Sequence, residues 1–300
     1  MTTSQERIGF IGVGLMGHGM ARNIVEKGYT LTVMGNRNRT PVEDLVGRGA
    51  TEVKTAKALA QASDIIFMCV TSSVQVEALV RGPDGIKAGA SKGLVIVDCT
   101  TADPNSTLAL NAELAPMGVT FCDAPLGGTP ANAQLGQLSA MVGADDATFA
   151  RIKPVCDTWA QKVVHLGPVG DGHKMKLLNN FVAMGYAAIY SEALALSQKV
   201  GITPQVFDSV LRGSRMDCGF YQTFFRYVLE RDRDAHQFTL VNALKDMRYL
   251  ESMADGVSIA NPVGNAVKNS YALACAAGME QDYVPMLSDA VARFNGTKLA

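Results

Sequence analysis

A run of closely spaced glycines near the start of the chain has the pattern of a phosphate-binding turn. It follows a predicted strand at residues 7–11 and opens a predicted helix at residues 16–27. In this setting the first glycine permits a tight turn, the second lets a pyrophosphate approach the main chain, and the third allows close packing of helix and strand. The helix N-terminus also presents N–H groups to the phosphates. We expect this turn to bind a dinucleotide cofactor, and its residues are Gly12, Gly14 and Gly17, with Leu15 and Met16 between the last two.

The residues after the next predicted strand, 30–34, indicate which dinucleotide is bound. An NAD site usually has Asp or Glu about 20 residues after the glycine turn, where it accepts a hydrogen bond from the ribose 2′-hydroxyl. Here no acid appears before Glu43, and the turn holds Asn36, Arg37 and Arg39 instead. Guanidinium groups bind a phosphate in bidentate geometry. We expect NADP(H) to be preferred over NAD(H), the alternative being that both arginines belong to a solvated turn.

A lysine and an asparagine four residues apart could carry out proton transfer. Lys176 and Asn180 lie in the run Gly-Asp-Gly-His-Lys-Met-Lys-Leu-Leu-Asn-Asn that starts at Gly170. At this spacing they share one face of a helix. An ammonium group beside a neutral amide on an otherwise apolar helix suits a proton donor and its partner. The spacing alone also fits an ordinary amphipathic helix with a solvated lysine, so it leaves both interpretations open.

The elements that must position these residues form two groups. In the first half, β-rich runs alternate with helical stretches, which is typical of a parallel sheet covered on both faces. The class is α/β, and we expect a Rossmann-like doubly wound sheet domain over residues 1–165. Val70 and Thr71, at the end of a predicted strand, are counted among the cofactor-binding residues. The predicted strands are residues 7–11, 30–34, 64–70, 94–98, 119–123 and 138–142, and the predicted helices are 16–27, 74–80 and 104–115.

The second half has a different pattern. From His173 apolar residues recur at helical spacing, and no helix breaker appears before Gly201. We therefore expect an all-α domain over residues 166–300, led by a long interdomain helix. This domain would bind substrate and form subunit contacts, because a long apolar helix often buries one face in a partner. Further helices are predicted at residues 204–211, 240–254, 262–277 and 285–294.

The composition argues against several classes of protein. The 300 residues carry a formal net charge of −1, whereas general affinity for nucleic acid or an anionic membrane needs a basic excess. The longest apolar runs are far shorter than the roughly 20 residues that cross a bilayer, and the first residues lack the features of a signal peptide. The cysteines and histidines show no metal-ligand spacing. We expect a cytoplasmic protein without a metal site.

Several sequence blocks together resemble the β-hydroxyacid dehydrogenases, a family that includes 3-hydroxyisobutyrate dehydrogenase and tartronate semialdehyde reductase. Three are long, and a short fourth is Leu244-Lys245-Asp246; together they span most of the chain in the family's order. The resemblance implies a cleft between a Rossmann-like domain and a helical domain. The long blocks are Gly-Phe-Ile-Gly-Val-Gly-Leu-Met-Gly-His-Gly-Met from Gly9, Asp-Ala-Pro-Leu-Gly-Gly-Thr-Pro-Ala-Asn-Ala-Gln-Leu-Gly-Gln-Leu from Asp123, and the run from Gly170.

The resemblance also implies roles for single residues. It makes Lys176 the catalytic lysine, Asn180 its substrate-orienting partner, and Lys245 a contact to cofactor or substrate. Asp98-Cys99-Thr100-Thr101 is similar to the family's Asp-x-Ser-Thr block. Thr101 then takes the position that contacts the nicotinamide end of the cofactor and the substrate.

One block departs from the family pattern. The family usually reads Asp-Ala-Pro-Val-Ser-Gly-Gly, but here Gly127 replaces the serine and Thr129 replaces the last glycine. In the family this turn holds the substrate carboxylate through N–H groups and the serine hydroxyl. Backbone donors remain at Gly127 and Gly128, and such a turn still forms an anion-binding concavity. We expect Gly127, Gly128 and Thr129 to bind substrate, with Thr129 as a candidate replacement for the hydroxyl.

The expected reaction is reversible hydride transfer between a nicotinamide cofactor and the β-carbon of a small anionic hydroxy acid or aldehyde acid, with Lys176 as general acid and base. The expected assembly is a homodimer or homotetramer. The first alternative is an imine reductase or a decarboxylating relative on the same scaffold. Imine reductases typically lack the lysine, and the decarboxylating relatives usually have a larger helical domain. The second alternative is a non-catalytic dinucleotide-binding module.

Overall fold

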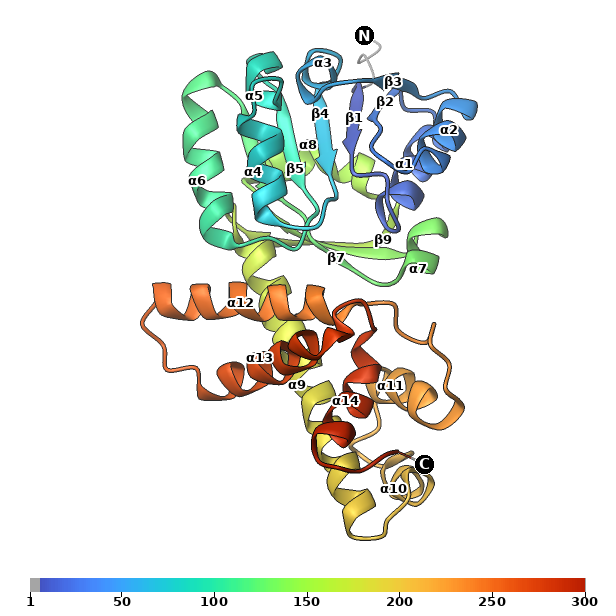
Figure 1. The fold of residues 1–300 in the computed structure, drawn as a ribbon. Helices are drawn as coiled ribbons and strands as arrows, with labels where there is room; N and C mark the ends of the chain where they lie inside the picture. Colours follow the sequence, from blue (N-terminus) through green and yellow to red (C-terminus); the bar gives the residue numbers. More distant parts are fainter. Residues whose placement is uncertain (1–5, 300) are drawn as a thin grey trace. The chain divides into compact units, whose positions relative to one another are not determined.

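The computed structural model describes residues 6–299, which divide between Lys176 and Leu177 into two compact units (Figure 1). The expected boundary near residue 165 falls inside a strand, Ala160–Gly167 (β9), that pairs with its neighbour as far as Gly167. The division lies instead within the helix Asp171–Lys199 (α9). A Cβ on Gly172 would overlap the Met141 carbonyl oxygen. The first turn of α9 therefore packs directly on sheet backbone and belongs to the first unit.

The first unit is built on one mixed sheet, which has nine strands within residues 6–299. Its order is β3-β2-β1-β4-β5-β6-β8-β7, with β9 beside β8. The first six strands are parallel, as the expected Rossmann-like fold requires, but β8 is antiparallel to both β6 and β7. The strands are β1 Ile8–Ile11, β2 Leu31–Met34, β3 Thr51–Val53, β4 Ile65–Met68, β5 Val95–Asp98, β6 Thr120–Asp123, β7 Leu126–Gly127, β8 Leu138–Gly143 and β9. Of these, β3, β7 and β9 are not among the strands expected from the sequence.

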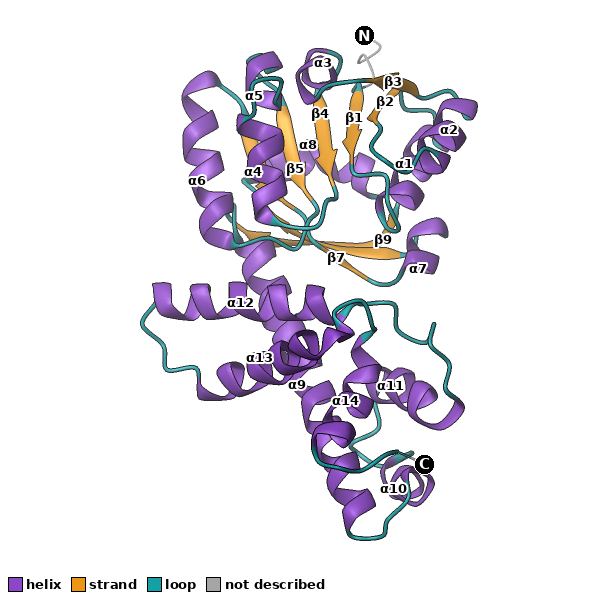
Figure 2. Cartoon of the chain, in the orientation of Figure 1, coloured by secondary structure: helices purple, strands orange, loops and turns teal. Residues whose placement is uncertain are grey.

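Helices cover both faces of this sheet (Figure 2). Successive strand residues point to opposite faces, so Phe10 and Phe67 pack in one core and Ile11 and Met68 in the other. The expected helices α1, α4 and α6 are present, and the others were not expected. The helices are α1 Gly17–Glu26, α2 Thr40–Gly47, α3 Ala56–Gln61, α4 Ser73–Arg81, α5 Ile86–Gly89, α6 Pro104–Leu114, the 3₁₀ turn Ala115–Met117, α7 Pro130–Gln134 and α8 Asp146–Cys156.

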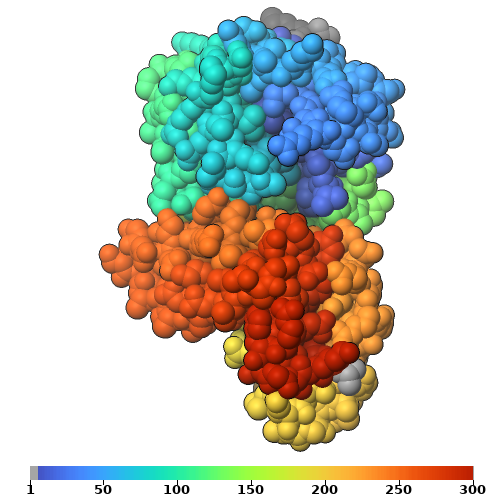
Figure 3. All heavy atoms as spheres, in the orientation of Figure 1, coloured from blue at the N-terminus to red at the C-terminus, as the bar shows by residue number. Residues whose placement is uncertain are grey.

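The second unit is all-helical, as expected, and among residues 6–299 its extended pairing is limited to one isolated bridge between Thr239 and Tyr283. Aromatic side chains such as Tyr221 and Phe225 fill its core. On the side drawn in Figure 3, its surface is formed largely by the segments from α12 to α14. Among the helices of the second unit, only α11 was not expected from the sequence. The helices are α9, α10 Pro204–Leu211, α11 Gly219–Glu230, α12 Leu240–Gly256, α13 Pro262–Ala274 with the π turn Cys275–Met279, the 3₁₀ turn Val284–Met286, and α14 Leu287–Phe294. Among the helices of the described residues, we find none long and apolar enough to span a bilayer.

Candidate active site

The glycine turn between β1 and α1 has the geometry that a dinucleotide needs. Gly12 has φ +93°, and a Cβ there would overlap the Cys69 carbonyl oxygen; a Cβ on Gly17 would overlap the Gly12 carbonyl oxygen. Gly14, in contrast, faces open space, and Leu15 beside it is exposed. No side chain caps the first turn of α1 among the described residues, and this turn contains no acid. The residues present therefore fit a pyrophosphate, because the chain leaves both the space and the helix N-terminus open.

The turn after β2 contains a feature that the sequence does not suggest. Arg39 donates from Nη1 and Nη2 to the two carboxylate oxygens of Glu52 on β3, at 2.7 and 2.8 Å. The pair lies over Gly35, whose Cβ would be 2.5 Å from Arg39 Nη1 and 2.6 Å from Glu52 Oε1. The hydrogen bonds from Arg39 lower the pKa of Glu52. An acid is thus present beside Gly35 and Arg39, supplied by the parallel pairing of β2 and β3 rather than by the turn itself.

The carboxyl ends of β4 and β5 are connected by hydrogen bonds. The Val70 N–H donates to Thr100 Oγ1 at 3.1 Å, and the Thr100 N–H donates to Asp98 Oδ1 at 2.9 Å. The Thr71 hydroxyl donates to Gln75 Oε1 at 2.7 Å. The threonine that replaces the family serine at position 100 thus keeps a working hydroxyl, and it holds two strand ends together. Thr101 follows directly and is partly buried.

A buried polar cluster fixes the start of α9. The Asp123 carboxylate at the end of β6 accepts from the N–H groups of Gly170 and His173, at 2.6 and 2.7 Å. The fully buried His173 ring places Nδ1 2.7 Å from Thr107 Oγ1 and Nε2 2.8 Å from the Thr100 carbonyl oxygen. Burial raises the pKa of Asp123, while the charge of His173 and these N–H donors oppose that shift. His173 therefore anchors the helix on which Lys176 lies one turn later.

A second buried acid orients Asn180. Asn180 Nδ2 donates to Asp246 Oδ2 on α12 at 2.7 Å, and both side chains are buried. Lys245 Nζ lies 3.0 Å from Asp246 Oδ1 and 5.4 Å from the centre of the Tyr249 ring. The sequence interpretation assigned no role to Asp246. The sequence signal that could have identified Asp246 is its position directly after Lys245 in the Leu-Lys-Asp block.

The turn after β7 is arranged differently from expectation. The Thr129 hydroxyl accepts from the Asn132 N–H at 3.3 Å and donates to Asn132 Oδ1 at 2.7 Å, which caps α7. It is therefore engaged within the turn. Gly127 pairs with Ser139 on β8, and Gly128 has φ +118°.

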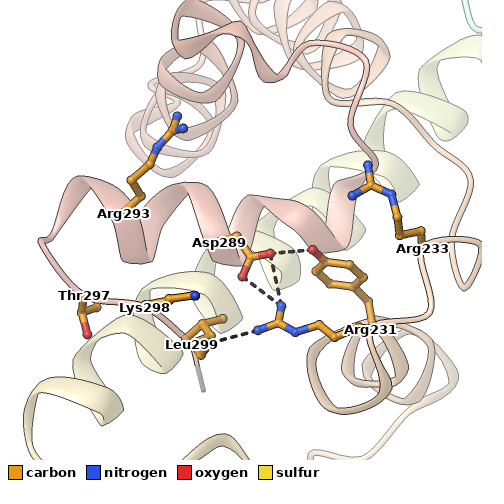
Figure 4. Close-up of a pocket in the computed structure, with 8 residues that line it drawn as sticks. Arg231, Arg233, Asp289, Arg293, Thr297, Lys298 and Leu299 are labelled. Atoms are coloured by element: carbon orange, nitrogen blue, oxygen red, sulfur yellow. Dashed lines mark hydrogen bonds and ion pairs between the residues drawn. The ribbon is translucent and has the colours of Figure 1, made fainter.

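The described residues contain other features that do not involve the candidate site residues. A pocket of about 590 Å³ in the helical unit is lined by none of the predicted site residues (Figure 4). In it Arg231, with φ +57°, is paired with Asp289 at 3.0 Å. Both ring nitrogens of His18 are hydrogen-bonded, Nε2 to Asp44 Oδ2 at 2.9 Å and Nδ1 to Gln134 Nε2 at 3.1 Å. Within residues 6–299 no group of three or more His, Cys, Asp or Glu side chains could hold a metal ion.

Comparison with known proteins decides the family. Residues 7–167 match the family model of the NAD-binding domain of 6-phosphogluconate dehydrogenase, and residues 170–288 match the NAD-binding domain of NADP-dependent 3-hydroxyisobutyrate dehydrogenase. The chain belongs to the β-hydroxyacid dehydrogenase family. The resemblance found in the sequence blocks is therefore confirmed.

Individual β-hydroxyacid dehydrogenases are similar to this chain over most of their length. The chain is 35% identical to 2-(hydroxymethyl)glutarate dehydrogenase of Eubacterium barkeri, over 68% of each chain. It is 36% identical to 2-hydroxy-3-oxopropionate reductase of Escherichia coli, over 69% of this chain and 70% of that one. The crystal structure of 3-hydroxyisobutyrate dehydrogenase from Salmonella typhimurium has the same fold, with a TM-score of 0.83, 23% identity, and coverage of 96% of this chain and 99% of that one.

Proposed function

We propose that this family member transfers hydride reversibly between NADP(H) and the β-carbon of a small hydroxy acid or aldehyde acid, with Lys176 as general acid and base. The observation that carries the proposal is the double fixation of α9. Asp123 and His173 hold its first turn, and Asp246 holds Asn180 one turn beyond Lys176. The names of the two curated relatives, a hydroxymethyl-acid dehydrogenase and a hydroxy-oxo-acid reductase, support a 3-hydroxyisobutyrate- or tartronate-semialdehyde-like substrate.

The proposed chemistry divides the work between the bound cofactor and the chain. The nicotinamide supplies or accepts the hydride. In the reducing direction the Lys176 ammonium donates a proton to the developing alkoxide oxygen, and in the oxidising direction the neutral amine accepts it. Asn180 has two N–H donors on Nδ2. Asp246 accepts a hydrogen bond from one of these N–H groups and so fixes the orientation of the amide. The other N–H group then orients the substrate hydroxyl.

For the cofactor, we propose that Asn36, Arg37 and Arg39 bind the 2′-phosphate of NADP(H), while Gly12, Gly14, Leu15, Met16 and Gly17 hold the pyrophosphate. The guanidinium geometry supports this choice. Arg39 reaches the phosphate only in competition with Glu52, so Arg37 contributes the larger share. Arg37→Gln should weaken NADP(H) binding and leave NAD(H) binding unchanged, as measured by fluorescence titration of each cofactor.

We also propose that the second copy in a homo-oligomer covers α9. Val182, Ile189 and Leu196 recur every seven residues on this helix and are 53%, 62% and 65% exposed. An exposed apolar stripe of this kind along one helix is typical of a subunit contact. Ile189→Glu should shift the mass measured by light scattering towards the monomer.

The alternatives make different predictions in one assay. A panel of small hydroxy acids, aldehyde acids and cyclic imines is tested with both cofactors by following nicotinamide absorbance. We expect turnover with the acids and with NADP(H) preferred. Turnover of imines alone would favour an imine reductase, and release of CO₂ with the acids would favour a decarboxylating relative. Tight cofactor binding without any turnover would favour a non-catalytic module.

A further inference from the structure

The space beside Gly127 is filled by a side chain on the neighbouring strand. Gly127 on β7 lies opposite Ser139 on β8 in antiparallel register. A Cβ on Gly127 would lie well inside 3.0 Å of Ser139 Oγ, closer than real Cβ contacts occur. The backbone at Gly127 does not have the positive φ that favours glycine. The Ser139 hydroxyl therefore occupies the volume in which a side chain of residue 127 would begin.

This hydroxyl is oriented away from the core. Leu138, Ala140 and Val142 alternate with it along β8 and are buried in the core. Ser139 is only partly buried, and among residues 6–299 its hydroxyl has no hydrogen-bond partner. A hydroxyl held in position by a strand and left without a protein partner is available to a ligand.

A second donor lies in the same turn. Gly128 follows Gly127 directly, has φ +118° and is exposed. Its N–H also has no hydrogen-bond partner among the described residues, whereas the N–H of Thr129 is taken by Asn132 Oδ1 at 3.0 Å. The turn thus presents a backbone donor and a hydroxyl donor without a carboxylate of its own beside them. Two neutral donors at neighbouring positions suit an anionic oxygen group.

We propose that Ser139 is a substrate-binding residue, which donates its hydroxyl hydrogen bond to the substrate carboxylate together with the N–H of Gly128. The proposal rests on the proposed function, because that function supplies an acid as substrate. It assigns to β8 a contact that the sequence expected from position 127 or 129. The carboxylate is the ligand group because the proposed function places the cofactor phosphates at the turn after β1 and the turn after β2.

The first test removes the hydroxyl. Ser139→Ala should raise KM for 3-hydroxyisobutyrate or the best acid of the panel by about tenfold, the usual scale for a hydrogen bond to a charged group. We expect kcat to change less than about twofold and NADP(H) affinity to stay unchanged, because the hydroxyl touches neither the reacting carbon nor the cofactor. Ser106→Ala is the matched control, since it removes a hydroxyl that donates to Glu77 on the other side of the sheet unit. It should leave KM unchanged.

The second test exchanges the two residues. Gly127→Ser alone should raise KM and lower thermal stability, because the new Cβ overlaps Ser139 Oγ. Gly127→Ser combined with Ser139→Gly removes the overlap and returns a hydroxyl to the same volume. We expect this double variant to recover KM to within about threefold of the original chain, which a merely structural role for Ser139 would not produce.

The outcomes separate this inference from the proposed function. If the chain turns over an acid and Ser139→Ala leaves KM unchanged, or changes only kcat or cofactor binding, the Ser139 inference is wrong and the function stands. If no acid is turned over, the proposed function fails. Calorimetric titration of 3-hydroxyisobutyrate onto the NADP⁺-loaded protein then still tests the inference. It is overturned if the chain does not bind the acid, or if Ser139→Ala binds it as tightly.

Discussion

The two glycine turns of the first unit use glycine for different reasons. In the turn after β1, Gly12 and Gly17 are required by main-chain atoms, because a Cβ on either would overlap a carbonyl oxygen. At the end of β7, Gly127 is opposed instead by a side chain, that of Ser139. The first requirement comes from the fold and cannot be removed by changing another residue. The second is a property of this chain, and one substitution on β8 would remove it.

The largest expected effect concerns Lys176, which lies in neither of the two turns. In the proposed function each turn holds an anion, but neither contains a group that could exchange a proton at the substrate oxygen. Lys176→Ala should therefore lower turnover by about 10²–10⁴-fold while cofactor affinity stays unchanged. Steady-state kinetics and cofactor titration measure the two quantities. Lys174→Ala is the control on the same helix, because Lys174 is paired with Asp171 at 2.9 Å. Near-normal turnover of the Lys176 variant would refute its role.

The next effect tests whether the main chain imposes glycine on the first turn. Gly12→Ala should lower the free energy of unfolding by about 3 kcal/mol, because both φ +93° and the Cys69 carbonyl oxygen oppose a side chain. Gly14→Ala in the same turn meets no protein atom within 4 Å. It should keep stability within about 0.5 kcal/mol and weaken cofactor binding, since its methyl group enters the space of the pyrophosphate. Thermal denaturation and cofactor titration of both variants would contradict this contrast if the two behaved alike.

The smallest effect concerns a third glycine, Gly35, over which the pair of Arg39 and Glu52 lies. Glu52→Gln should strengthen NADP(H) binding by about threefold to fivefold at low salt and leave NAD(H) binding unchanged, because it releases Arg39 and removes a negative charge near the 2′-phosphate. Asp64→Asn is the matched control. Asp64 pairs with Arg7 at 2.7 Å with side-chain exposures of 32% and 51%, close to the 30% and 48% of Glu52 and Arg39. Weaker NAD(H) binding by the Gln variant would instead make Glu52 a ribose ligand.

Local patterns carried most of what the sequence could predict. The glycine turn, the strand and helix around it, and the shared helix face of Lys176 and Asn180 depend on residues within about one turn or one strand. The contacts that were missed join distant segments. Pairing of β2 with β3 brings Glu52 to Arg39, and pairing of β7 with β8 brings Ser139 to Gly127. Asp246 contacts Asn180 from another helix.

Elements were missed for related reasons. Helix α8 contains Pro154, which normally argues against a helix interior. Strand β9 carries exposed polar residues at Gln161 and Lys162, so it lacks the apolar run of the other strands. Both elements are stabilised by packing rather than by local preference. The antiparallel insertion of β8 also follows from tertiary pairing, and it brings Ser139 beside Gly127.

The position of the unit boundary inside α9 has a consequence for dissecting the protein. A fragment ending at Lys176 would retain only residues 171–176 of this helix, the part that Asp123 and His173 anchor to the first unit. The complementary fragment would begin at Leu177 and keep Asn180 with Asp246. Cutting the chain where its contacts divide therefore parts Lys176, the proposed proton donor, from Asn180. A fragment intended to retain both must keep α9 whole.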